Sequence, residues 1–305
     1  MGLFCHRPRD YDGPMKTSLF ALAACLAVVP AFGSTPEQDW KAAIADENRD
    51  YAQVPHAMLK IQDAAYIGEG QFATLTGRKG DPASWHWHTD GKAAGPLRIA
   101  LRDSKLTVTL NGKKVDGIDK SIAVDGDVDV RGEPTQVGAG MIGWRVFIYN
   151  QKNPAAVDFS GVAYYPFDPA FRVKARFIPD AKLTPKTFRT SRGTDKQFFH
   201  GGDAVFALKG ERITLPFYAE SNDPSKVKDM SAFYTDALTG KGAYGAGRYV
   251  DITDFGKFPP ADVMIDFNQA YNPNCARSAF FTCPVAVDNI ELAMKAGERD
   301  PHSLH

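Results

Sequence analysis

Residues 106–110 read Leu-Thr-Val-Thr-Leu and are followed directly by Asn111 and Gly112. Apolar and polar side chains alternate over this stretch, as expected for a strand with one face against a core. Asn-Gly suits a two-residue turn between antiparallel strands, because both turn positions need a positive φ. The stretch therefore predicts a β-hairpin and indicates a chain rich in β structure.

Similar short runs follow one another along most of the chain, separated by Gly, Asp, Asn and Pro. The runs that we interpret as strands lie at 97–101, 106–110, 122–124, 128–130, 144–149, 173–178, 204–208, 213–218, 248–252 and 263–267. Short segments at such spacing are typical of antiparallel β proteins. We predict a mainly β chain with an antiparallel β-sandwich or barrel-like architecture.

One short helix is expected before the β region. Thr35 and Pro36 provide a hydroxyl cap and a proline in the first turn, and acidic residues follow them. Trp40 and Tyr51 belong to an apolar stripe at helical spacing. We predict a helix that ends near Tyr51 and lays its Trp40 side on the body of the protein.

Residues 1–33 are interpreted as an upstream extension with a signal peptide. A basic residue, Lys16, precedes an apolar run at 19–29, and small residues lead up to Ser34. The run is too short to span a bilayer. We therefore expect export, with the periplasm as destination; a lipid anchor at Cys25 stays open as an alternative.

Charge and hydropathy restrict the partners of the remaining chain. Residues 34–305 carry 33 Lys and Arg against 34 Asp and Glu, so their net charge attracts neither nucleic acid nor anionic membrane over long range. No later apolar run is long enough for a membrane span. We expect one β-rich domain over 34–299, with a possible seam near 179–193, and a disordered tail at 300–305.

Removal of the signal peptide leaves two cysteines, Cys275 and Cys283, in a loop rich in Pro and Asn. Cysteines of exported proteins commonly form disulfides, so we predict a disulfide between them. A redox motif fits less well because the spacing is not Cys-x-x-Cys. A zinc site fits less well because histidines are not close in sequence.

The motifs of common enzymes and metal sites are absent from the sequence. There is no Gly-x-Ser-x-Gly elbow, phosphate loop or His-Glu-x-x-His motif. His86 and His88 alternate with Trp85 and Trp87, which fits a strand with a buried aromatic face better than a metal site. We predict no metal and no cofactor.

Polar and ionisable side chains gather near the C-terminus. A Gly-rich turn at 239–247 leads into Arg248, whose guanidinium can grip a carboxylate or phosphate. The alternative is a buried ion pair of Arg248 with Asp266 or Glu298. The candidate ligand-binding residues are Arg248, Asp266, Asn268, Tyr271, Asn272 and Glu298.

These C-terminal motifs resemble those of exported bacterial proteins with the domain of unknown function 1684. The resemblance rests on Tyr-Gly-x-Gly-Arg at 244–248, Asp-Phe-Asn-x-Ala-Tyr-Asn-Pro-x-Cys at 266–275, Cys-Pro at 283–284 and Ala-Gly-Glu at 296–298. Gln269 departs from the arginine usual in the family, which weakens the case for an anion held by two arginines. The resemblance implies an exported β-rich protein but no known activity.

Three functions remain open at this point. The first is a cell-envelope protein that binds a small polar or anionic ligand at the candidate residues. The second is a hydrolase that uses Asp266 or Glu298 as acid or base. The third is a structural or assembly module in which the polar cluster only holds the C-terminus in place.

Overall fold

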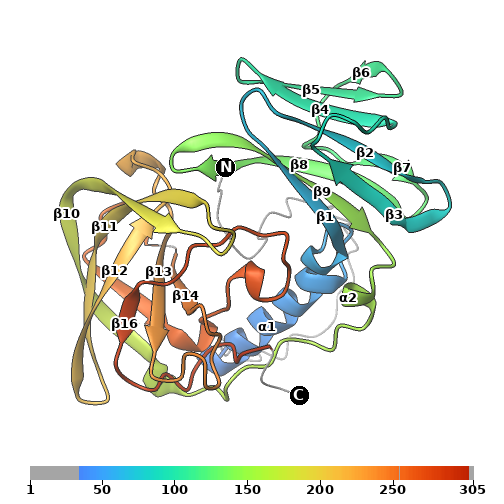
Figure 1. The fold of residues 1–305 in the computed structure, drawn as a ribbon. Coiled ribbons are helices and arrows are strands. Elements are labelled where there is room, and N and C mark those ends of the chain that lie inside the picture. Colours follow the sequence, from blue (N-terminus) through green and yellow to red (C-terminus); the bar gives the residue numbers. More distant parts are fainter. Residues whose placement is uncertain (1–33, 254, 302–305) are drawn as a thin grey trace, which may run out of the picture.

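The computed structural model describes residues 34–253 and 255–301, and most of the described strands pair antiparallel (Figure 1). The helices are α1 (Pro36–Ala52) and the single turn α2 (Pro154–Val157). The predicted mainly β architecture with one N-terminal helix is confirmed. The proposed signal peptide and the last four residues lie outside the described part of the chain.

The first half of the chain forms two sheets that pack face to face. One has the strand order β3-β2-β4-β5-β6 and the other has β1-β9-β8-β7. Their bounds are β1 (Ile61–Ile67), β2 (Phe72–Arg78), β3 (Asp81–His88), β4 (Leu97–Arg102), β5 (Lys105–Leu110), β6 (Lys113–Val115), β7 (Ile122–Asp125), β8 (Val128–Gly138) and β9 (Met141–Asn150). Trp85, Trp87, Leu97 and Ile99 belong to the core between the sheets.

The hairpin expected from residues 106–112 is formed by β5 and β6. Asn111 and Gly112 have φ values of 50° and 76°, which are the positive angles that a two-residue turn of this kind needs. The alternation of aromatic and imidazole rings in β3 is also as expected. Trp85 and Trp87 are buried, His86 is exposed and His88 is half-buried.

The second half of the chain forms a strongly curved sheet with its own core. The strand order is β14-β13-β12-β11-β10-β15, and β16 pairs in parallel with β13. The bounds are β10 (Arg172–Arg189), β11 (Asp195–Leu208), β12 (Glu211–Ala219), β13 (Met230–Asp236), β14 (Arg248–Ile252), β15 (Asp262–Asp266) and β16 (Asp288–Ile290). Residues 179–189 of the expected seam lie in β10, and the rest of it lies in the hairpin that leads to β11.

A bulge interrupts the pairing of β10 with β11. The register shifts between Pro179 and Thr184 on one strand, opposite Gly202 on the other. Gly202 has a φ of 145°, and a Cβ there would lie 2.4 Å from the carbonyl oxygen of Ile178. The close approach of the two backbones therefore requires glycine at this position.

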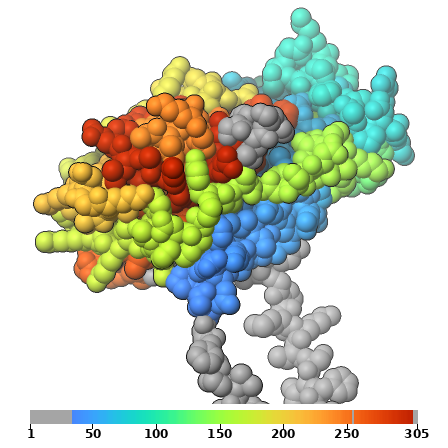
Figure 2. All heavy atoms as spheres, turned by 90° about the horizontal axis from the view of Figure 1, so that it is seen from below, coloured from blue at the N-terminus to red at the C-terminus, as the bar shows by residue number. Residues whose placement is uncertain are grey.

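Helix α1 begins as its sequence predicts. The side chain of Thr35 accepts a hydrogen bond from the backbone of Gln38, and the Gln38 side chain accepts one from the backbone of Thr35 in return. The helix packs against the segment before β10, where Tyr164 and Phe167 contact Trp40, and beside the turn after β15 (Figures 1 and 2). Trp40 fastens it there, because its indole Nε1 donates to the backbone oxygen of Asn268 over 2.9 Å.

Candidate functional site

The stretch 266–275 closes the curved sheet. After β15 the chain turns through a short 3-10 helix, η4 (Phe267–Gln269), and the carboxylate of Asp266 caps this helix by accepting from the Asn268 backbone over 3.0 Å. Tyr271 then exchanges two backbone hydrogen bonds with Tyr249 of β14, over 2.8 and 2.9 Å. Strands β14 and β15, at opposite ends of the strand order, are thereby connected.

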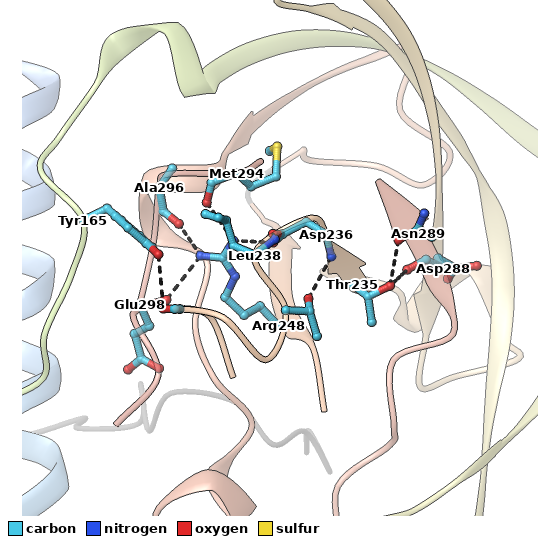
Figure 3. Close-up of polar contacts among 12 residues, drawn as sticks. Tyr165, Thr235, Asp236, Leu238, Arg248, Asp288, Asn289, Met294, Ala296 and Glu298 are labelled. Atoms are coloured by element: carbon cyan, nitrogen blue, oxygen red, sulfur yellow. Dashed lines mark hydrogen bonds and ion pairs between the residues drawn. The ribbon is translucent and has the colours of Figure 1, made fainter. Parts of the chain in front are cut away.

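Arg248 is fully buried at the start of β14 and acts as a clamp on the C-terminal segment (Figure 3). Its guanidinium pairs with Asp236 at the end of β13. It also donates to the backbone oxygens of Met294, Ala296 and Glu298. These contacts hold the backbone of 294–298 against the sheet.

The predicted carboxylate partner of Arg248 was wrong. The ion pair is made with Asp236, whereas Glu298 contributes its backbone oxygen and Asp266 lies 3.8 Å from Arg172 Nε. Burial opposes the charge of the Arg248 guanidinium, but Tyr234 and Asp236 outweigh this effect and raise its pKa. The guanidinium therefore stays charged inside the core.

Asn268 joins the closing stretch to the segment before β10. Its Nδ2 donates to the Asp168 backbone oxygen over 2.9 Å, and its Oδ1 accepts from the Asp168 backbone over 2.9 Å. The same Nδ2 lies 2.9 Å from Asp266. Both ends of this buried amide are used within the fold.

Tyr271 is held by a different group of residues. Its hydroxyl donates to the carboxylate of Asp251 over 3.1 Å, and Ser231 donates to the same carboxylate over 2.6 Å. Its ring packs in an aromatic cluster with Tyr249 and Phe233. Tyr271 therefore lies where β14 is joined to the stretch after β15, and its hydroxyl is bonded to Asp251, which was not among the candidate residues.

Asn272 and Glu298 meet at a second buried arginine, Arg277. One carboxylate oxygen of Glu298 accepts from the Asn272 backbone and from Arg277 over 3.2 Å. Asn272 Nδ2 donates to the Arg299 backbone oxygen over 2.8 Å. We call Asn272, Arg277, Ser278 and Glu298 the Arg277 centre; all four residues are buried or have nearly inaccessible side chains.

Two polar atoms of the Arg277 centre lack a protein partner in the described part of the chain. They are Asn272 Oδ1 and Ser278 Oγ, and both are inaccessible to solvent. Buried polar groups are nearly always hydrogen-bonded, since an unmet one costs about 1–3 kcal/mol. The centre thus has an acceptor and a hydroxyl available to a further group.

Helix α1 supplies one wall of the Arg277 centre. The Arg277 guanidinium carbon lies 5.3 Å from the centroid of the Tyr51 ring. Glu47, one turn earlier, is buried and accepts from the hydroxyls of Tyr51 and Tyr164. Burial opposes the charge of Arg277, but Glu298 and Tyr51 outweigh it and raise the arginine pKa.

Sequence reasoning missed both Arg277 and Glu47. Glu47 lies four residues before Tyr51 and seven after Trp40, so it falls on the apolar face of α1. An acidic residue on that face signals a buried carboxylate and could have been noticed. Arg277 lies between the two cysteines, and no local pattern marks it.

The two cysteines lie beside one tyrosine. Burial raises the pKa of Tyr244 to about 12, with further contributions from its hydrogen bond to Cys275 and from Cys283. The predicted disulfide is not formed in the structure. Both cysteines nevertheless pack against the same apolar cluster as Tyr51 and Phe281.

Residues 34–253 and 255–301 carry neither a metal-binding cluster nor a membrane-spanning helix. This part of the chain holds no group of three or more His, Cys, Asp or Glu side chains placed to bind a metal ion. It also has no helix with the length and apolarity that crossing a bilayer demands.

Comparison with known proteins gives a family but no activity. Residues 157–299 match the model of the family described as a protein of unknown function (DUF1684). A solution NMR structure of an uncharacterized protein from Haloarcula marismortui is 30% identical in sequence; the match covers 47% of this chain and 78% of that one, with a TM-score of 0.40. No curated protein matches. Over residues 157–299 the chain therefore belongs to the DUF1684 family, as its C-terminal motifs predicted.

Proposed function

We propose that the protein is an exported cell-envelope protein that binds a small polar ligand at the Arg277 centre. The observation that carries the proposal is the pair of buried atoms Asn272 Oδ1 and Ser278 Oγ, which have no partner within the described chain. A ligand hydroxyl or amide could donate to the first and accept from the second. Such hydrogen bonds fix the orientation of small ligands in mostly apolar sites.

The charges of the centre restrict the ligand. The described residues around Arg277 contribute one guanidinium and two carboxylates, Glu298 and Glu47. An added anion meets repulsion from both carboxylates, whereas hydroxyl groups can pair with either charge. The proposal is therefore an uncharged, hydroxyl-rich molecule, which narrows the earlier expectation of a polar or anionic ligand.

Export to the periplasm is supported by the sequence pattern of residues 1–33, and the disulfide belongs to the same proposal. In an oxidising compartment we expect Cys275 and Cys283 to be joined. Both cysteines pack in one apolar cluster and act on the same tyrosine, Tyr244, which supports this pairing. A bond there would restrain the loop that carries Arg277 and Ser278.

A purely structural role of the C-terminal cluster is the second candidate. It is favoured by Arg248, which contacts one carboxylate and three backbone oxygens, and by Asn268, whose amide is used at both ends. These two residues explain the order of the C-terminal segment without any ligand. They leave the open atoms at Asn272 and Ser278 unexplained.

The test compares Ser278→Ala with the unchanged protein in a thermal-shift screen of neutral sugars, amino sugars and sugar acids. Removal of a buried hydroxyl that has no protein partner should leave the melting temperature unchanged or slightly higher. The shift caused by a neutral sugar should be lost. Ser231→Ala is the matched control: it removes a hydroxyl bonded to Asp251, so it should lower stability and keep the ligand response.

Two outcomes would refute the binding role. One is a screen in which the unchanged protein responds to no member. The other is a ligand response that Ser278→Ala retains in full.

A further inference from the structure

The sheet β3-β2-β4-β5-β6 has an outer face made of polar and basic side chains. Direct pairing across the strands aligns His88 with Thr74, Thr74 with Arg98, Arg98 with Thr109, and Thr109 with Lys114. These five side chains form what we call the cross-strand row. They lie on the face opposite the core, since their strand neighbours Trp87 and Leu97 are buried on the inner face. Arg98 and Lys114 are exposed on this face, whereas His88 and Thr109 are half-buried and Thr74 is buried beneath Arg98.

The row alternates basic and hydroxyl side chains. His88, Arg98 and Lys114 lie on β3, β4 and β6, with a threonine on each strand between them. Adjacent strands are about 4.8 Å apart, so the basic side chains recur at intervals of about 10 Å. The row thus presents basic side chains at regular intervals, of which Arg98 and Lys114 carry the positive charge.

The charge of this sheet differs from that of the whole chain. Residues 72–115 contain eight Lys and Arg against three Asp and Glu, although the full chain is formally neutral. Of the three acids, Asp81 pairs with Arg78. A carboxylate from outside the sheet, Asp63 of β1, lies 3.5 Å from His86 next to the row. The excess of positive charge therefore belongs to this sheet and not to the whole two-sheet half, because residues 61–150 carry eleven Lys and Arg against eleven Asp and Glu.

The basic side chains of the row are positioned by their neighbours. The Arg98 guanidinium lies 3.8 Å from the centroid of the Phe72 ring and donates to Thr74 Oγ1 over 3.2 Å. His88 Nε2 lies 2.8 Å from Thr76 Oγ1. Ordered side chains lose less conformational entropy on binding. Figures 1 and 2 show this sheet at the end of the molecule away from the C-terminal strands.

We propose that the cross-strand row binds an anionic polysaccharide, with its acid groups at Arg98 and Lys114 and a further polar contact at His88. An extended glycan advances by close to one strand spacing per sugar unit. A polymer with an acid on alternate sugars therefore matches the spacing of Arg98 and Lys114, which lie two strands apart. Arg98 serves best as the central contact because it can donate two parallel hydrogen bonds to a carboxylate or sulfate.

The face suits a glycan better than a membrane or a nucleic acid. The exposed large hydrophobic residues of the described chain all lie outside 72–115, so nothing on the face inserts into lipid. Single-stranded nucleic acid is held by base stacking on exposed aromatic rings. Here Trp85 and Trp87 are buried on the inner face, and Phe72 is covered by Arg98.

The experiment measures binding to immobilised hyaluronan, which has one carboxylate per disaccharide, at low and at physiological salt. The double variant Arg98→Gln with Lys114→Gln is compared with Lys182→Gln plus Lys228→Gln, which removes the same charge from exposed positions in the other half of the chain. The first pair should weaken binding by about tenfold, equivalent to about 1.4 kcal/mol over two exposed contacts, and flatten its salt dependence. The control pair should bind like the unchanged protein.

A second double variant, Arg98→Lys with Lys114→Arg, keeps both positive charges and should retain most of the affinity. It shows whether a loss of binding comes from the removed charge or from misfolding of the sheet. Oligothymidine and vesicles with anionic lipid serve as competing probes. No hyaluronan binding at low salt, equal weakening by both charge-removing pairs, or binding only to oligothymidine or vesicles would each overturn the proposal.

Discussion

Replacement of Arg248 by methionine tests whether the C-terminal segment is held by a buried clamp. The side chains of Arg248 and Asp236 are 0% and 1% exposed, so the substitution leaves a carboxylate buried without its cation. Breaking a buried ion pair in this way costs about 3–5 kcal/mol. The backbone oxygens of Met294, Ala296 and Glu298 lose a donor at the same time. We expect the free energy of unfolding to fall by about 4 kcal/mol.

The measurement is urea denaturation followed by tryptophan fluorescence. Arg172→Met is the control, because its partner Asp266 is 3.8 Å away and the arginine side chain is 42% exposed; its cost should stay below about 1 kcal/mol. Asp236→Leu combined with Arg248→Met should cost less than the sum of the single changes by about 2 kcal/mol, because no charge is then left alone. A loss below about 1 kcal/mol for Arg248→Met, at an unchanged denaturant slope, would refute the clamp.

Two further predictions concern chemistry at other positions. Protein purified from the periplasm should resist alkylation at Cys275 and Cys283 until it is reduced, with a Cys275→Ser variant as control; alkylation of both thiols without reductant would contradict the disulfide. Burial of Asp129 disfavours its charged form, but hydrogen bonds from His56 and Ser121 outweigh this and lower its pKa. Its ionised form therefore stabilises the fold above the unfolded-state pKa of about 3.9, and this contribution is lost as pH falls through the lower folded-state pKa. In Asp129→Asn the melting temperature should therefore fall less steeply as the pH is lowered, whereas the exposed control Asp116→Asn should behave like the unchanged protein. Equal slopes of melting temperature against pH in the two variants would exclude the effect.

Alternation predicted strands well where one face is solvated. Strand β5 was identified because its outward threonines separate the apolar residues that face the core. Strand β13 was missed, since nearly all of Met230–Asp236 is buried and no alternation is visible. It lies between β12 and β14 and also pairs with β16, so both of its faces and both of its edges are covered.

The division into three sheets could not be read from the sequence either. It depends on pairings between distant segments, such as that of β1 with β9. Local patterns carry no information on such pairings. The same limit explains the wrong partner of Arg248. Asp236 ends the strand that was missed, so it was never considered.

The clamp and the Arg277 centre are connected through one residue. The backbone oxygen of Glu298 accepts from Arg248, and its carboxylate points the other way (Figure 3). That carboxylate accepts from Arg277 and from the Asn272 backbone. Gly297 allows this arrangement with a φ of 77°, and a Cβ there would lie 2.5 Å from the Ala270 backbone oxygen. The structural and binding hypotheses are therefore not exclusive, because the clamp holds the carboxylate that faces the proposed ligand. Weakening the clamp should lower both the stability of the fold and, indirectly, the affinity for the ligand. Ser278→Ala should abolish ligand binding without a loss of stability. This difference separates the positioning role of the clamp from direct contact with the ligand.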